Sequence, residues 1–243
     1  MDSISFLENK NLKKLLEIFR KNNKNLYVVG GAVRDFLLGL TPKKMDIDLC
    51  SAVSIQELVF MLEGSDFFVR PKSLMMGVVS IVCNEDSFEY AQFRKESYSN
   101  SHSHNPKQIE FVTSLEIDAM RRDFTINSIY FDLINSEFID LFGGIEDLQN
   151  RLIRTVQDPK ITLAVDPARI LRMIEFSLRL GFEIDGKTRE VARVFAKNCL
   201  SRAPSRKEIE LNKIKNADKC YLNFTPRDFE RTKDSLLREF GIF

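Results

Sequence analysis

The chain has 243 residues, of which 44% are hydrophobic and 29% are charged, with 20 phenylalanines and no tryptophan. This composition supplies a sizeable core and excludes an intrinsically disordered chain, a collagen-like repeat and a disulfide-stapled miniprotein. The formal net charge is +1, so the charge of the whole chain gives no reason to expect a nucleic-acid partner.

The charge is unevenly distributed along the chain. Residues 187–243 carry 14 Lys and Arg against 8 Asp and Glu, a surplus of six positive charges. Residues 1–186 carry 22 basic and 27 acidic residues, a surplus of five negative charges. This division predicts a polyanionic partner for the C-terminal segment and cation binding in the part that precedes it.

Four cysteines, Cys50, Cys83, Cys199 and Cys220, show no C-x-x-C spacing. This pattern fits neither a zinc site nor a disulfide framework, so we expect reduced packing residues in a cytoplasmic protein. The N-terminus lacks the apolar stretch of a signal peptide, and no apolar run is long enough to span a membrane. A soluble protein with no membrane partner is therefore expected.

Up to about residue 145, short β-branched or aromatic runs alternate with helical stretches. Strands are expected over residues 26–29, 45–49, 78–83, 88–93, 128–133 and 137–141. Helices are expected over residues 32–38 and from the N-cap Ser54 through Glu63. Residues 84–87 and 134–136 are typical of hairpin turns, and the polar segment 97–107, which holds both histidines, is expected to be a loop.

After residue 145 the pattern is helical. Helices are expected over residues 170–180, 188–198, 204–216 and 226–240, the first ending at Gly181. We therefore predict an α+β fold in two domains. Residues 1–144 form a mixed sheet flanked by helices, and residues 145–243 form an all-α domain with a basic C-terminal extension.

The strongest local signal is a glycine pair, Gly30 and Gly31, between a predicted strand and a predicted helix. Glycine allows a close backbone approach, and the amides that open a helix can bind an anion. Arg34 lies one turn into the helix, where a guanidinium can grip a phosphate through two hydrogen bonds. A glycine pair by itself is more often only a turn.

Asp46 and Asp48 follow on the next predicted strand, two residues apart and so on one face. Two adjacent carboxylates are unfavourable unless a cation lies between them, and oxygen ligands suit Mg²⁺ carried in with substrate phosphates. Such a pair by itself is usually a solvated strand face. Together with the glycine turn and Arg34, it predicts metal-assisted phosphoryl or nucleotidyl transfer.

Four motifs extend this pattern over about residues 26–185. They are G-G-x-V-R-D-x-L-L-G with D-x-D (30–48), R-R-D-F-T-I-N (121–127), D-x-x-G-G-x-x-D-L (140–148) and D-P-x-R-x-L-R (166–172). In this order they resemble the class II nucleotidyltransferases, the family of bacterial tRNA CCA-adding enzymes and poly(A) polymerases. The resemblance implies a nucleotidyltransferase head followed by a helical neck.

The resemblance also implies catalytic roles. Asp46 and Asp48 would hold two Mg²⁺ ions, and Glu89 would be a third carboxylate that helps to activate the RNA 3′-hydroxyl. From the residues alone, Glu89 is more simply an exposed strand residue. The substrates implied are CTP and ATP.

Further residues would bind the nucleotide if the resemblance holds. The implied contacts are Gly30, Gly31 and Arg34 for the triphosphate, Arg121 or Arg122 for phosphate charge, and Asp123 and Asn127 for the sugar. From the residues alone, the two arginines could equally be the end of a helix and its cap.

The last motif departs from the family pattern. The resemblance implies that Asp166 and Arg169 face the base and that Arg172, one turn on, also binds the nucleotide. Val165, however, replaces a glutamate and Glu175 replaces an arginine. Valine offers no acceptor oxygen, so the choice between C and A stays open: the remaining pair suffices, or specificity is relaxed, or it is narrowed to one nucleotide. Arg172 and Glu175 are expected to form a surface ion pair.

The stretch around Val78 is similar to the h-G-T-V segment of CCA-adding members and lacks the R-R-F stretch of poly(A) polymerases. It therefore favours addition of CCA to a tRNA 3′ end. Poly(A) synthesis and addition of single nucleotides (A-adding or CC-adding) are alternatives. A catalytically idle RNA-binding protein is a further alternative, suggested by Val165 and Glu175, but the intact pair of Asp46 and Asp48 argues against it.

The basic C-terminal segment is the candidate RNA surface. Its candidate residues are Arg202, Arg206, Lys207, Lys213, Lys215 and Lys219. A solvated helix face explains the same charges. Family members continue into helical body and tail domains that hold the tRNA, so we expect the chain to bind only an acceptor end, to act with a partner or as a homo-oligomer, or to be a trimmed piece.

Overall fold

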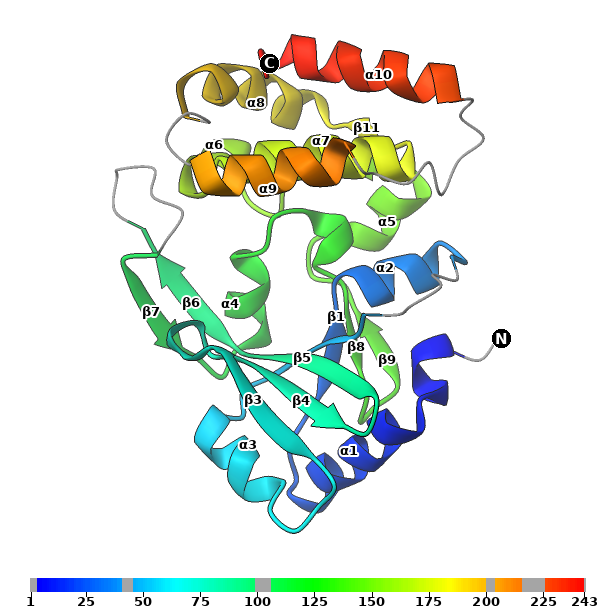
Figure 1. Cartoon of the computed structure of the whole chain (residues 1–243), viewed down its shortest axis with the longest axis vertical. Coiled ribbons are helices and arrows are strands. Elements are labelled where there is room, and N and C mark those ends of the chain that lie inside the picture. Colours follow the sequence, from blue (N-terminus) through cyan, green and yellow to red (C-terminus); the bar gives the residue numbers. More distant parts are fainter. Residues whose placement is uncertain (1–3, 41–45, 99–105, 200–203, 216–225, 243) are drawn as a thin grey trace. The chain divides into compact units, whose positions relative to one another are not determined.

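The computed structural model of the chain (Figure 1) describes residues 4–40, 46–98, 106–199, 204–215 and 226–242. Its contacts divide the chain into two compact units. The head unit comprises Met1–Glu96, Ile109–Arg122 and Ile126–Ile145, and the helical unit comprises Ser97–Gln108, Asp123–Thr125 and Glu146–Phe243. We predicted a single domain boundary, between residues 144 and 145. The contacts divide the chain after Ile145 and also assign two short earlier segments to the helical unit.

The head unit is built on a seven-stranded sheet with the order β3-β4-β5-β2-β1-β8-β9. Its strands are β1 (Tyr27–Val29), β2 (Asp48–Ser51), β3 (Phe68–Ser73), β4 (Val78–Cys83), β5 (Asp86–Gln92), β8 (Tyr130–Asp132) and β9 (Glu137–Ile139). Strands β2 and β5 are parallel, and the other neighbouring pairs are antiparallel. The predicted mixed sheet is confirmed.

Short helices and one separate hairpin complete the head unit. The elements are η1 (Ser5–Glu8), α1 (Lys10–Lys21), α2 (Gly31–Leu37), α3 (Ile55–Met61), η2 (Leu74–Met76), α4 (Leu115–Met120) and the hairpin of β6 (Arg94–Ser97) with β7 (Gln108–Phe111). Helix α1, for which we predicted nothing, buries Leu12, Leu15, Leu16 and Phe19 on one face. Ser54 caps α3 as predicted, since its hydroxyl accepts from the Glu57 amide at 3.1 Å.

Most predicted elements of the head unit have bounds that differ by a few residues from those in the structure. Strand β2 begins at Asp48, which pairs with Val29, the last residue of β1, so Asp46 precedes the strand. The β4–β5 turn is shorter than predicted, because Cys83 pairs with Asp86 and Asn84 adopts a positive φ of 53°. Most of the predicted loop over residues 97–107 lies outside the described residues.

The cysteines of the head unit, Cys50 and Cys83, are buried and free, which confirms the prediction that they are packing residues. The side chain of Cys199 and the whole of Cys220 lie outside the described residues.

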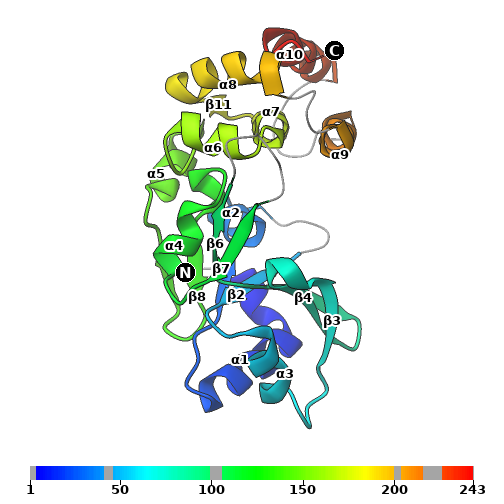
Figure 2. The ribbon, with the colours of Figure 1, turned by 90° about the vertical axis from the view of Figure 1, so that its left-hand side faces the viewer.

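The helical unit confirms the predicted helices. Its elements are β10 (Leu152–Ile153), α6 (Pro159–Val165), α7 (Ala168–Leu180), β11 (Glu183–Ile184), α8 (Gly186–Cys199), α9 (Pro204–Lys215) and α10 (Pro226–Glu239). Strands β10 and β11 form a short parallel pair. Helix α7 ends at Gly181 with a φ of 64° and packs against α9, and both helices are seen nearly end-on in Figure 2.

Two short elements contain residues of both units, because a unit boundary falls within each of them. They are η3 (Thr125–Asn127) and α5 (Gly144–Gln149). Among the described residues, no helix combines the length and apolar character that crossing a membrane requires. The predicted α+β fold, with a mixed sheet followed by helices, is confirmed.

Candidate functional site

The turn from β1 into α2 brings backbone close to a carboxylate. Gly30 has φ 78° and ψ −131°, a conformation that favours glycine. A Cβ at this position would lie 3.6 Å from Oδ2 of Asp48. The first turn of α2 therefore opens beside the Asp48 carboxylate, and the predicted contact of this turn with an anion remains a prediction.

Asp48 and Glu89 lie opposite each other on the parallel strands β2 and β5. The Asp48 carboxylate reaches solvent but is surrounded by protein atoms. This surrounding and the nearby Glu89 carboxylate raise the pKa of Asp48 to about 6, an effect that Arg122 partly opposes. A carboxylate with a raised pKa beside a second carboxylate is a site where a cation is favoured.

A pocket of about 290 Å³ collects these groups, and all of its lining residues belong to the head unit. The lining residues are Asp46, Ile47, Asp48, Lys72, Ser80, Ser87 and Glu89. Mg²⁺ is commonly held by one or two carboxylates together with substrate phosphates, so Asp46 and Asp48 fit such an ion. Within the described residues, however, no three acidic, histidine or cysteine side chains assemble a metal site.

The Glu89 carboxylate is engaged by a lysine. Lys72 on β3 donates from Nζ to Oε2 of Glu89. The carboxylate that was predicted to be the third of the cluster is thus bound to an ammonium group in this structure, and sequence reasoning did not single out Lys72.

Arg34 and Asn127, predicted to contact phosphate and sugar, lie together in the head unit. Arg34 is only 3% exposed. Its Nε and Nη2 donate to Oδ1 of Asp35 at 2.8 and 2.6 Å, and its Nη1 donates to Oδ1 of Asn127 at 2.8 Å. These contacts tie α2 to η3, and the nucleotide-binding roles of both residues remain predictions.

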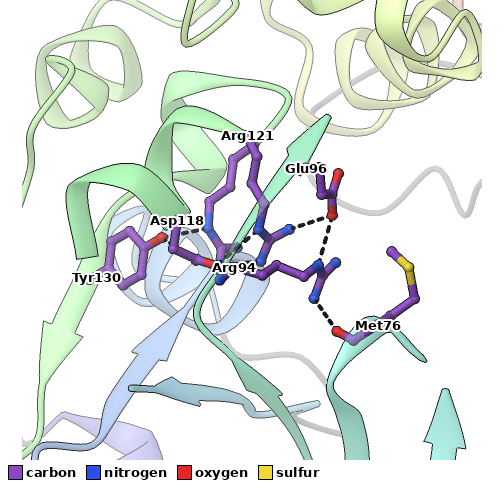
Figure 3. A network of polar contacts seen from close by, with 7 residues as sticks. Met76, Arg94, Glu96, Asp118, Arg121 and Tyr130 are labelled. Carbon is purple, nitrogen blue, oxygen red and sulfur yellow. Dashed lines mark hydrogen bonds and ion pairs between the residues drawn. The ribbon is translucent and has the colours of Figure 1, made fainter. Parts of the chain in front are cut away.

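Arg121 and Arg122 are both held by one carboxylate that we had not singled out, Asp118. Figure 3 labels Asp118 with Arg121 and Tyr130. Asp118 Oδ1 accepts from Nη2 of Arg121 at 2.7 Å, and Oδ2 accepts from Nη2 of Arg122 at 3.1 Å. The Tyr130 hydroxyl donates to Oδ2 at 2.8 Å. Asp118 has no exposed surface, and burial alone would raise its pKa, but Arg122 and Arg121 hold the pKa at about 2.

The spacing of this cluster was a signal in the sequence. An acidic residue three and four positions before two arginines faces both of them across a helical turn. In the structure α4 ends at Met120, with Arg121 as its C-cap, so the arginines do lie at a helix end. Their role in neutralising phosphate charge remains a prediction.

The Asp118 cluster extends through Arg121 to the hairpin of β6 and β7. Arg94 donates from Nε to Oε1 of Glu96 at 2.7 Å, and the same oxygen lies 3.5 Å from Nη1 of Arg121. Arg94 also donates from Nη1 to the Met76 carbonyl at 3.0 Å (Figure 3). One network of charges therefore connects η2, β6 and the end of α4.

In the helical unit, Asp123 binds Arg172. The Arg172 Nε donates to Oδ2 of Asp123 at 2.7 Å, while Oδ1 accepts from the Phe124 amide at 2.8 Å. Burial would raise the pKa of Asp123, but Arg172 and Arg169 hold it below its usual range. Two predicted nucleotide ligands thus bind each other in this structure.

The predicted surface pair of Arg172 with Glu175 is wrong. Glu175 is 7% exposed and lies 3.3 Å from Nη1 of Arg179, whose guanidinium also stacks on Phe176. Glu175 is therefore a buried, paired residue, and its position on the covered face of α7 is the physical reason.

Asp166 has a structural contact that the sequence did not indicate. Its Oδ1 accepts from the Ala168 amide at 3.0 Å, at the start of α7. Arg169 donates from Nη1 to the Thr162 carbonyl at 3.4 Å, and the neighbouring Val165 ends α6 half-buried. The assignment of Asp166 and Arg169 to base recognition remains a prediction.

The D-x-x-G-G motif has a local structural role. Oδ1 of Asp140 accepts from the Gly144 amide and Oδ2 from the Ile145 amide, each at 2.8 Å, so this carboxylate caps α5. Gly143 has a φ of 75°, which favours glycine in the turn that carries the cap.

The candidate RNA residues are only partly described. Lys213 is exposed and donates to Oε1 of Glu210 at 3.0 Å, and Lys207 is half-buried. Arg206 and Lys215 lie on α9 with side chains outside the described residues, and Arg202 and Lys219 lie outside them entirely. An RNA surface here remains a prediction.

Known proteins resemble most of this chain. A CCA-adding enzyme of Bacillus pumilus is 33% identical over 206 residues, covering 85% of this chain and 50% of that protein. One from a Geobacillus species is 36% identical over 180 residues, covering 72% and 42%. The chain thus spans about half the length of these curated relatives.

Solved structures agree with these relatives. A CCA-adding enzyme in its apo form II has a TM-score of 0.76 at 27% identity, covering 94% of this chain and 51% of that chain. A tRNA nucleotidyltransferase complexed with a primer tRNA and an incoming ATP analog has a TM-score of 0.74 at 26% identity, covering 94% and 60%.

A family profile identifies the part of the chain that these proteins share. The profile described as the poly A polymerase head domain matches residues 26–154, which is more than half of the chain. These residues include the Gly30 turn, the Asp48 and Glu89 pocket and the Asp118 cluster. The chain therefore belongs to the nucleotidyltransferase family of the poly A polymerase head domain.

Proposed function

We propose that this chain adds nucleotides from CTP and ATP to an RNA 3′ end, and that its substrate is a tRNA lacking its terminal CCA. The observation that carries the proposal is the placement of Asp48 between the Gly30 turn and Glu89, in one pocket with Asp46. Relatives called CCA-adding enzymes, and a similar structure with a primer tRNA and an ATP analog, support the choice of substrate.

The chemistry follows from the charges in the pocket. The RNA 3′-oxygen attacks the α-phosphorus, and the bond to the departing pyrophosphate breaks. Asp46 and Asp48 would hold two Mg²⁺, which when bound supply charge stabilisation for the attacking and leaving oxygens. The Gly31 amide at the start of α2 would approach the triphosphate, and Glu89 would accept the proton of the 3′-hydroxyl.

The base would be chosen by residues of the helical unit. Asp166 and Arg169 carry an acceptor and donors suited to a base edge, whereas Val165 carries neither. This valine is the observation that favours a second candidate, an enzyme that adds only one kind of nucleotide.

A direct experiment tests the proposal. The chain is incubated with Mg²⁺, a tRNA that lacks its 3′ CCA, and CTP and ATP together, either one labelled in turn, with intact tRNA as the control. Addition of two C and one A that then stops is expected. An open-ended A tail would indicate a poly(A) polymerase, addition of one kind of nucleotide would indicate the second candidate, and no incorporation at all would contradict the proposal.

We also propose where the chain contacts RNA and that a second protein chain takes part. The basic C-terminal segment, with Lys207 and Lys213 on its described part, is the proposed RNA contact. A second copy of the chain or a partner protein would extend that contact. Filter binding at increasing salt, with sedimentation of the free and RNA-bound chain, measures both properties.

A further inference from the structure

Lys72 lies at an irregularity in the edge strand of the sheet. The pairing of β3 with β4 runs from Phe68 opposite Val82 to Pro71 opposite Val79, and resumes with Ser73 opposite Val78. Lys72 therefore has no paired position on β4. A bulge of this kind redirects a side chain and is common beside functional sites.

The redirected side chain reaches the carboxylates of the pocket. Lys72 lines the same pocket as Asp46 and Asp48, and its Nζ binds Oε2 of Glu89. The side chains of Lys72 and Glu89 are 53% and 42% exposed. Water screens a pair that is exposed to this extent, so the pair is weak and exchangeable.

The consequence for a bound cation follows from the position of Glu89. Glu89 lies opposite Asp48 on one side and opposite Ser80 on the other, so its carboxylate borders the pair predicted to hold metal. A carboxylate oxygen bound to an ammonium group is not available as a metal ligand.

We propose that Lys72 is a positioning residue that competes with divalent cations for Glu89. Its ammonium group occupies the Glu89 carboxylate and lowers the affinity of the pocket for Mg²⁺. Glu89 joins a bound metal ion only when Lys72 is released. This inference rests on the proposed function only in taking Asp46 and Asp48 as the metal ligands.

A titration with metal alone tests the inference. Binding of Mn²⁺ to the full chain is measured by calorimetry at pH 8 and low salt, without nucleotide or RNA. Lys72→Met is expected to tighten binding on the order of fivefold, because it frees the Glu89 carboxylate for the metal ion. Lys72→Arg, which keeps the charge, is expected to bind as the unchanged chain does.

The matched control is Lys24→Met. Lys24 also forms an exposed ion pair, 2.6 Å from Glu57, but neither residue lines the pocket. This variant loses the same charge, so we expect its Mn²⁺ affinity to stay within about twofold of the unchanged chain. Thermal unfolding of each variant establishes that the chain under test is folded.

A second comparison shows whether Lys72 acts through Glu89. In a Glu89→Gln background, adding Lys72→Met is expected to change Mn²⁺ affinity by less than about twofold. Unchanged or weaker binding in Lys72→Met alone would overturn the proposal and leave Lys72 as a charge that only protects an edge strand. A gain that persists in Glu89→Gln would overturn it too. These titrations require no transferase activity, so the proposed function can fail without deciding them.

Discussion

The predicted metal site and the predicted sugar site place their carboxylates in opposite surroundings. In the head unit, Asp48 and Glu89 line a pocket beside Asp46, and their carboxylates reach solvent. In the helical unit, Asp123 is 8% exposed and binds Arg172 through a 2.7 Å hydrogen bond. The difference separates residues that can receive a cation from residues whose charge is already neutralised. A motif match alone assigns both groups to the nucleotide.

The sharpest test of the head unit is Asp48→Ala. Removing a carboxylate of the predicted metal pair is expected to lower nucleotide incorporation at least about a hundredfold, because the Mg²⁺ that would balance the phosphate charge is no longer held. Incorporation of labelled CTP or ATP into an RNA 3′ end measures the effect. Asp66→Asn is the matched control, since Asp66 pairs at 3.6 Å with Lys14, outside the pocket. Full activity of Asp48→Ala would remove the head unit from the mechanism.

The buried Asp118 cluster predicts a large effect on stability. Asp118→Asn removes the buried carboxylate charge that Arg121 and Arg122 share, so the free energy of unfolding is expected to fall by about 3 kcal/mol. Urea denaturation measures this loss. A change below about 1 kcal/mol would show that the cluster contributes little to the fold of the head unit.

Asp48 and Asp118 are expected to affect metal affinity and stability, respectively, in different pH ranges. The folded pKa of Asp48 is about 6, so metal affinity should fall by up to about tenfold per pH unit below 6, as the carboxylate is protonated. The folded pKa of Asp118 is about 2, below that of an unfolded aspartate. Its contribution to stability is therefore present above about pH 4 and lost as the pH falls toward 2. Mn²⁺ titrations and urea denaturation across this range separate the two.

In the helical unit, a double-mutant cycle measures how strongly Asp123 and Arg172 are coupled. Asp123→Asn, Arg172→Met and the double variant are expected to give a coupling of about 1.5 kcal/mol in the free energy of unfolding. Additive losses would contradict the conclusion that these two charges neutralise each other.

The smallest expected effect concerns base choice. Val165→Glu restores the carboxylate of the family pattern, and we expect the ratio of CTP to ATP incorporation to change by about threefold to tenfold, because a new acceptor faces the base edge. Val165→Gln is the matched control for size. An unchanged ratio would place base recognition elsewhere in the helical unit.

Several features could be predicted from neighbouring residues alone. The glycine turn after β1, the capping of α3 by Ser54 and the end of α7 at Gly181 depend on backbone preferences within a few residues. The first residue of β2 could not be predicted this way, because it depends on the pairing of Asp48 with Val29, the last residue of β1. Likewise, helical spacing placed Glu175 near Arg172 but did not indicate that this part of α7 is covered.

The sequence by itself determined the α+β fold and the family and supplied the candidate site residues, because periodicity, caps and motif spacing are local properties of the chain. Only the tertiary structure decided how those residues are partnered. Lys72 meets Glu89 across 17 positions and Arg172 meets Asp123 across 49. Alternation along a strand or helix assigns a side chain to a face, but strand pairing and helix packing bring its partner to it, and that partner decides whether its charge is free for substrate.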